Sequence, residues 1–196
     1  MDRKLLLIVL SITVERFMIN CLPYLKIISG TDFISPFYLE MAYRESLNSP
    51  DPSTQLGAIL TNEYGGIISR GYNRFPEKVT VTNERLDRSQ KLFYMEHAER
   101  NAIFAALKES KDLNKDNMIL YCPWYACSDC ARAIINSGIK TVIGHKQMFD
   151  KTPDRWKESI IKGFEMFEES GTLCYAYDGS LGCDFEVRFD GKLWKP

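Results

Sequence analysis

The apolar positions in the N-terminal third of the chain change from a helical to an extended pattern. Residues 35–48, SPFYLEMAYRESLN, begin with a Ser-Pro pair and predict an amphipathic helix with proline in its first turn. Their apolar side chains recur at Phe37, Leu39, Met41, Ala42 and Leu47. A turn-rich loop follows at 49–54. Residues 55–73 predict two strands joined as a hairpin at 63–66.

The rest of the chain alternates between helical and short apolar patterns. After a polar loop at 74–88, residues 91–110, KLFYMEHAERNAIFAALKES, have helical periodicity that is strongest in their second half. Two further helices, each with a glycine at its end, are expected at 128–138 and 153–171. Short apolar runs without alternation predict buried strands at 118–122, 139–145 and 172–177.

The C-terminal residues 185–195, FEVRFDGKLWK, predict a hairpin that turns at Asp190-Gly191. The order of elements is therefore helix, hairpin, and then alternating helices and strands. This order favours an α/β fold with a mixed sheet of about five strands covered by helices. We expect three segments along the chain: a hydrophobic extension of unclear role at 1–31, a main domain at 32–178 and a hairpin tail at 179–196.

The extension contains an apolar run at 5–13 behind a charged start. This run is too short to span a bilayer, and no A-x-A-like cleavage site follows it. We therefore favour an amphipathic appendage, or a start codon assigned too far upstream, over a secretion signal.

Composition and charge restrict the class of partner. The 196 residues suit one domain, and the net charge of −1 gives no overall attraction to nucleic acid or to an anionic membrane. A local basic pocket for one phosphate remains compatible with this balance. Only one pair among the six cysteines has close spacing, and we expect the others to be buried thiols in a cytoplasmic protein.

One of the two histidines, His97, stands two residues before Glu99 at the start of the helical periodicity. Residues two apart on a helix point to different faces, so the two side chains have different roles if they share a site. The second histidine, His145, is expected to pack at the end of a strand.

Cys127 and Cys130 form a C-x-x-C pair at the start of the next helix, with one predicted strand between them and His97. Two helices on the same side of a sheet can bring their N-termini together, which would place one imidazole and two thiolates around a metal. Catalytic zinc typically has three protein ligands and one open position, whereas structural zinc has four. Glu99 then suits a proton carrier between water and substrate.

Other interpretations of these residues lead to different classes of protein. A structural zinc module would have no open coordination position and no role for Glu99. A redox protein that used Cys127 and Cys130 would leave His97 and Glu99 unexplained. H-x-E followed by C-x-x-C is instead the signature of zinc-dependent nucleobase deaminases, and it accounts for all four residues.

The chain resembles the cytidine and deoxycytidylate deaminase superfamily, and most closely the deoxycytidylate (dCMP) deaminases. The resemblance covers about residues 35–175 and is carried by four stretches: SPDPSTQLGAIL, SRGYNRFPEKV, MEHAERNAIFAAL and CPWYACSDCARAIINSGIKTVI. It implies a three-layer α-β-α deaminase domain that converts dCMP to dUMP and ammonia, a step in the supply of dTTP precursors. A related deaminase acting on a nucleoside, a modified cytidylate, tRNA or another cytosine or adenine carrier is the alternative.

The resemblance also implies roles for residues around the substrate. Asn73 would bond to a sugar hydroxyl, and the backbone at Ala98, Trp124 and Tyr125 would contact the cytosine edge. The two aromatic rings either stack on the pyrimidine or pack under the sheet edge. Asn101 either supports the site, which its match to the family favours, or forms local hydrogen bonds.

The chain departs from the family pattern where a phosphate would be bound. Arg74 stands where glycine is usual, and Lys108 stands where some phage relatives have an arginine. Each either reaches the phosphate or is a solvated side chain. Lys146 and Arg155 are further candidates. Ala126 replaces the usual proline before Cys127, which leaves the zinc ligands unchanged.

The resemblance implies a pyrimidine nucleotide as the small-molecule partner. It further implies a homo-oligomer, activation by dCTP and inhibition by dTTP. No membrane partner is expected, and the charge balance argues against nucleic acid.

Overall fold

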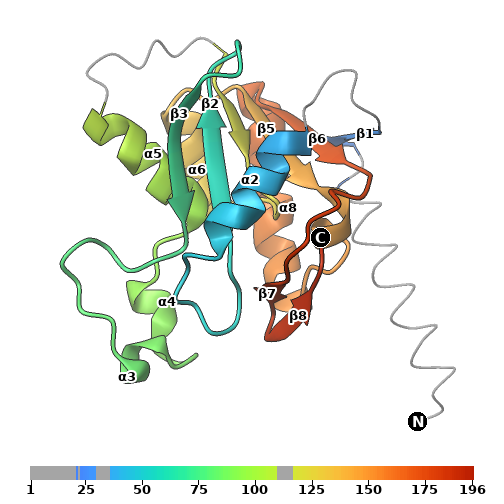
Figure 1. The fold of residues 1–196 in the computed structure, drawn as a ribbon. Coiled ribbons are helices and arrows are strands. Elements are labelled where there is room, and N and C mark those ends of the chain that lie inside the picture. The colour runs from blue at the N-terminus through green and yellow to red at the C-terminus, as the bar shows by residue number, and fades with distance from the viewer. Residues whose placement is uncertain (1–20, 22, 30–35, 110–116) are drawn as a thin grey trace, which may run out of the picture.

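The computed structural model describes residues 21, 23–29, 36–109 and 117–196 (Figure 1). Within these residues a six-stranded sheet is formed by β1 (Leu25–Ile28), β2 (Gly57–Thr61), β3 (Ile67–Tyr72), β4 (Ile119–Tyr121), β5 (Thr141–His145) and β6 (Leu173–Tyr177). The strand order is β1-β6-β5-β4-β2-β3. Strands β1, β6, β5 and β4 are parallel to their neighbours in that series, and β2 is antiparallel to both β4 and β3. The predicted mixed sheet is confirmed.

Strand β1 was not predicted from the sequence. It lies within the segment 1–31 and pairs with β6, with Leu25 opposite Cys174 and Ile28 opposite Tyr177. The sheet therefore has six strands in the described residues, where about five were expected. Four residues carry too little pattern to predict a strand, and the partner edge lies far away in the sequence. The apolar run at 5–13 lies outside the described residues.

Helices cover both faces of the sheet, as Figure 1 shows. One face carries α2 (Pro36–Ser46), and the other carries α5 (Ala98–Glu109), α6 (Ser128–Asn136) and α8 (Asp154–Ser170). Successive strand residues point to opposite faces. Ile59 and Tyr121 pack beneath α2, whereas Leu60 and Leu120 belong to the larger core on the other side. None of the helices in the described residues has both the length and the apolar character of a membrane span.

Most elements lie where the apolar pattern predicted them, but the segment 91–110 differs. It forms α4 (Lys91–Tyr94) and α5 with a break between them. At the break, Glu96 and Arg74 exchange two backbone hydrogen bonds of 2.8 and 3.1 Å. Tertiary pairing therefore interrupts the helix, and α5 begins directly after His97. Two further short helices were not predicted: α3 (Asn83–Leu86) and α7 (Lys146–Phe149).

The C-terminal hairpin consists of β7 (Val187–Phe189) and β8 (Lys192–Trp194), which confirms the predicted hairpin. Asp190 and Gly191 form its turn with φ values of 48° and 80°. These values lie in the left-handed region, which glycine and aspartate adopt more readily than other residues. Val187 and Phe189 are buried in the larger core, so the hairpin packs against the main domain.

Candidate active site

Three metal-ligating side chains meet at the N-terminal ends of two helices. His97 precedes α5, Cys127 is the N-cap residue of α6, and Cys130 lies in the first turn of α6. His97 Nδ1 lies 3.6 Å from Cys127 Sγ and 3.4 Å from Cys130 Sγ. The three ligand atoms all lie within 4.8 Å of one another. One imidazole and two thiols at this spacing fit a zinc ion with an open fourth position.

The two cysteines differ in acidity. The hydrogen bond with Cys130 is the largest influence on Cys127. Together with the hydrogen bond to His97, and against burial, it lowers the pKa of Cys127 to about 4. The same hydrogen bond with Cys127, followed by burial, raises the pKa of the Cys130 thiol. The hydrogen bond between the two sulfurs therefore favours a single negative charge on the pair, and binding of a metal would release the remaining proton.

Glu99 lies in the first turn of α5 and is only 3% exposed. Its Oε2 atom is buried and has no hydrogen-bond partner among the described residues. Burial raises the pKa of the carboxyl group, and the charge of His97 opposes that shift. A carboxyl group with a raised pKa and one free oxygen beside metal ligands is suited to accept and donate a proton.

A cavity of about 370 Å³ lies beside these side chains. His97, Glu99 and Cys127 line it, together with Trp124 and Trp156. The volume lies within the range of roughly 300–1,000 Å³ that small-molecule sites occupy. A small ligand in this cavity would therefore lie beside His97, Cys127 and Glu99.

The part of the chain that carries this site matches a known protein family. A family model described as the cytidine and deoxycytidylate deaminase zinc-binding region matches residues 35–146. The chain belongs to this deaminase family. It is therefore a hydrolase that acts on C–N bonds and a member of a zinc-binding family, and His97, Cys127 and Cys130 form a potential site for the zinc.

Individual deaminases align with more than half of the chain. An uncharacterized deaminase of Aliivibrio fischeri is 32% identical over 134 residues, which cover 68% of this chain and 86% of that protein. The deoxycytidylate deaminases of Mus musculus and Homo sapiens are 34% and 33% identical over 115 residues. This alignment covers 55% of the chain and 61% of either mammalian enzyme.

A solved deaminase structure has the same fold. The dCMP deaminase of the cyanophage S-TIM5, in complex with dCMP and dUMP, superposes with a TM-score of 0.53. The match covers 72% of this chain and 93% of the phage chain at 22% identity. The likeness shows that the three-layer arrangement is that of cytidine deaminase-like proteins.

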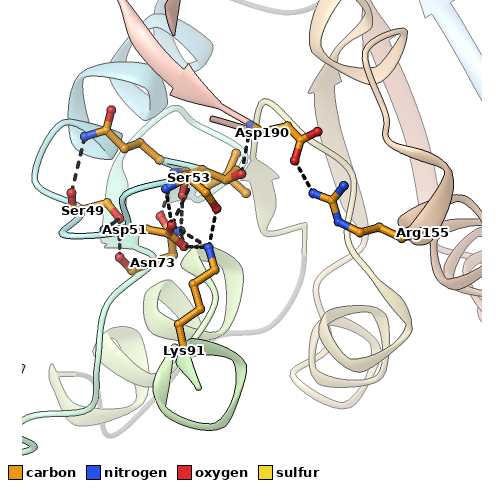
Figure 2. A network of polar contacts seen from close by, with 10 residues as sticks. Ser49, Asp51, Ser53, Asn73, Lys91, Arg155 and Asp190 are labelled. Carbon is orange, nitrogen blue, oxygen red and sulfur yellow. Dashed lines mark hydrogen bonds and ion pairs between the residues drawn. The ribbon is translucent and has the colours of Figure 1, made fainter. Parts of the chain in front are cut away.

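Asn73 lines the deaminase cavity, but its side chain already has protein partners (Figure 2). Its Oδ1 accepts a 2.7 Å hydrogen bond from the N–H of Leu56, and its Nδ2 donates to the carbonyl of Thr54 at 2.6 Å. Nδ2 also lies 3.4 Å from Oδ2 of Asp51. Asn73 thus fastens the loop 49–56 against the cavity, and its contact with a sugar hydroxyl stays a prediction.

Trp124 and Tyr125 both line the cavity. The indole N–H of Trp124 donates to Thr152 Oγ1 at 2.9 Å, and the ring meets Phe189 of the C-terminal hairpin edge-on at 5.0 Å. Tyr125 donates its hydroxyl to the carbonyl of Tyr175 at 2.5 Å. Both rings are therefore packed and anchored at the cavity wall, and any contact between their backbone and a base remains to be tested.

Three of the remaining predicted substrate residues, Arg74, Asn101 and Lys108, lie away from this cavity. Arg74 and Lys108 line a separate depression and both face Glu77, at 3.7 and 3.0 Å. Asn101 borders the same depression and donates to the carbonyls of Glu96 and of Tyr72 on β3, and its expected role in supporting the site stays a prediction. Ala98 is fully buried at the first position of α5. The structure therefore does not bring Arg74 or Lys108 together with Glu99.

Besides His97 and Glu99, the charged residues of the lining are Asp51, Arg88, Lys91 and Arg155, of which Arg155 was a predicted phosphate candidate. Lys91 and Asp51 form an ion pair of 2.7 Å whose side chains are 8% and 4% exposed. Neither residue of this pair was predicted from the sequence. The available signal was a lysine at the start of an apolar helical segment, which by itself is typical of a solvent-exposed position.

Proposed function

We propose that the protein converts dCMP and water to dUMP and ammonia. The observation that carries this proposal is the free Oε2 atom of Glu99, a residue that lines the same cavity as the metal-ligating residues His97 and Cys127. The alignments with deoxycytidylate deaminases support the choice of a deoxycytidylate over other cytosine carriers.

Each group has a defined part in this reaction. Zinc, when bound by His97, Cys127 and Cys130, supplies Lewis-acid activation of a water molecule. Glu99 accepts a proton from the water that adds to C4 of the ring and delivers it to N3. Glu99 then takes the second proton of the added water from the hydroxyl group at C4 and passes it to the departing amino group. Ammonia leaves, and the C4 carbonyl of dUMP forms. The free carboxylate oxygen lets Glu99 make both transfers without first breaking a protein hydrogen bond.

The cavity wall supplies the groups that would hold the nucleotide. Trp124 and Trp156 give apolar surface for the pyrimidine, and Arg88 and Arg155 give positive charge for a phosphate. The proposal also includes a hydrogen bond from Asn73 to a hydroxyl group of the sugar. It further includes contacts between the cytosine edge and the backbone of Ala98, Trp124 and Tyr125. Arg74 and Lys108 are not included because both contact Glu77 outside this cavity.

The wider biological setting is also part of the proposal. We infer a cytoplasmic homo-oligomer that responds to dCTP and dTTP, as the resemblance to deoxycytidylate deaminases implies. All six cysteines are free thiols, which agrees with a reducing compartment. The exposed Phe104 and Leu107 on the outer face of α5 agree with contacts between copies.

The test is ammonia release by the zinc-loaded protein from dCMP, deoxycytidine, CMP and dCTP, with Glu99→Gln as the matched variant. Preferential turnover of dCMP, lost in a variant that retains zinc, supports the proposal. Turnover of deoxycytidine without dCMP would move the substrate to the nucleoside. No turnover of any of the four, with one zinc tightly held per chain, would refute the nucleotide assignment.

A further inference from the structure

The C-terminal hairpin places a carboxylate against a cationic side chain of the cavity lining. Arg155, in the first turn of α8, lines the cavity and donates from Nη2 to Oδ1 of Asp190 at the hairpin tip. Figure 2 shows the two side chains directed toward each other across the space between α8 and the hairpin. Their side chains are 44% and 36% exposed, so solvent and small ions have access to the pair.

The position of Asp190 is set by the backbone around it. Its N–H donates to Thr54 Oγ1 at 3.2 Å, and the N–H of Gly191 donates to the carbonyl of Ser53 at 2.7 Å. These bonds tie the hairpin turn to the loop that carries the cavity residues Asp51, Ser53 and Thr54. The carboxylate therefore stays at this place when its side-chain partner changes.

The other charges of the cavity leave few cations for an anionic ligand. Lys91 Nζ lies 2.7 and 2.9 Å from the two oxygens of Asp51 and is almost completely buried. Arg88 and Arg155 are the two remaining cationic side chains of the lining. The hydrogen bond of Arg155, followed by the charges of Arg155, Arg88 and Lys192, keeps the pKa of Asp190 below its usual range, against burial. Asp190 is thus ionised at neutral pH and faces the same cations that a ligand phosphate would use.

We propose that Asp190 is an internal counter-anion of the cavity, and that the phosphate of a bound nucleotide replaces its carboxylate at Arg155. The guanidinium group binds carboxylate and phosphate through the same planar set of donors, so one anion can replace the other. The exchange costs little because exposed ion pairs contribute little to stability. Asp190 then lowers the affinity for phosphorylated pyrimidines relative to the nucleosides. This inference rests on the proposed function and extends it to a residue that sets specificity.

The experiment compares ligands that differ only in the phosphate. Calorimetry on the zinc-loaded protein would give dissociation constants for dUMP, deoxyuridine and inorganic phosphate. Asp190→Asn removes the charge and keeps a residue that tolerates the left-handed turn. We expect it to bind dUMP and phosphate roughly two- to fivefold more tightly, with deoxyuridine unchanged.

Two further variants isolate the effect. Asp184→Asn removes a carboxylate from another exposed ion pair near the C-terminus, with Arg44 at 3.3 Å, and should change none of the three constants. Arg155→Met should weaken binding of dUMP, and adding Asp190→Asn to it should then have no effect on that constant.

The outcomes separate this inference from the proposed function. Unchanged binding, weaker binding of dUMP, or equal changes for dUMP and deoxyuridine would each overturn the exchange at Arg155. If dCMP is deaminated and Asp190→Asn has no selective effect, only this inference fails. If dCMP is not deaminated but the variant still binds inorganic phosphate more tightly, the proposed function fails and the exchange of anions stands.

Discussion

Gly71 on β3 lies directly against Ala98 in the first turn of α5. A Cβ atom at position 71 would fall 2.4 Å from the carbonyl oxygen of Ala98 and 2.3 Å from the amide nitrogen of Ala102. Both are backbone atoms, so the helix cannot yield by turning a side chain. The absence of a side chain at Gly71 therefore allows α5 to approach the sheet and sets where His97 and Glu99 lie.

Gly71→Ala should displace the start of α5. We expect a loss of about 1–3 kcal/mol in the free energy of unfolding, as for other overpacked core positions. Urea denaturation measures this loss, and zinc affinity should fall with it. Arg70→Ala, at the exposed neighbouring position of β3, is the control and should change stability by less than about 0.5 kcal/mol. Equal stability of the two variants would contradict the close contact.

Glu99→Gln should separate proton transfer from metal binding. The amide has nearly the same shape as the carboxyl group but cannot carry a proton between water and substrate. We expect kcat to fall by a factor of about 10²–10⁴ while zinc content stays at the wild-type level. Metal analysis beside the ammonia assay checks both quantities. Retention of substantial activity would exclude Glu99 as the proton carrier.

Cys130→Ser should abolish tight zinc binding, because a hydroxyl group is a much weaker ligand for zinc than a thiolate. Atomic absorption on the purified protein measures the metal content. Cys174→Ser is the matched control, since Cys174 is also a buried free thiol but lies on β6 away from the three ligands. Loss of zinc in the control as well would point to general unfolding instead of a lost ligand.

Lys91→Met should be strongly destabilising. It leaves the carboxylate of Asp51 buried without its cation, and breaking a buried pair in this way typically costs about 3–5 kcal/mol. The double variant Asp51→Asn/Lys91→Met removes both charges and should recover part of that loss in chemical denaturation. If the double variant is no more stable than Lys91→Met, the two charges do not act as a pair.

Stability should fall on acidification because of His145. Its ring accepts from the hydroxyl of Tyr43 at 2.7 Å through Nδ1 and donates to the carbonyl of Gly179 at 2.9 Å through Nε2. Burial lowers the pKa of His145 below its ordinary value of 6.5, against the hydrogen bond to Gly179. The unfolded chain thus takes up a proton near pH 6.5 that the folded protein does not, so stability is lost as the pH falls below that value.

The comparison of wild type with His145→Gln isolates this contribution. Unfolding free energies at pH 7.5 and 5.5 should differ less for the variant than for the wild type. The other histidine, His97, is present in both proteins, so its own titration cancels in the comparison. An identical pH dependence in the two proteins would show that His145 takes up its proton equally well in the folded state.

The sequence alone determined the metal ligands and the elements that carry them. The types and spacing of His97, Glu99, Cys127 and Cys130 are local properties of the chain. The two cysteines also stand within one turn of a helix start that the apolar pattern predicts. The hairpin turn at Asp190-Gly191 was equally local. Such features depend on residues that are close in the chain, so the local order of residue types predicts them.

The tertiary structure alone decided which charges face the cavity. Arg74 and Lys108 carry the charge that a phosphate needs, but both lie in a separate depression, where they face Glu77. Arg155 reaches the cavity from α8, and Asp190 joins it from a hairpin 35 residues further along the chain. The pairing of β1 with β6 and the break before His97 also arise from contacts between distant segments. Each depends on contacts between segments that are distant in the sequence, and the local pattern of apolar and polar residues does not encode these contacts.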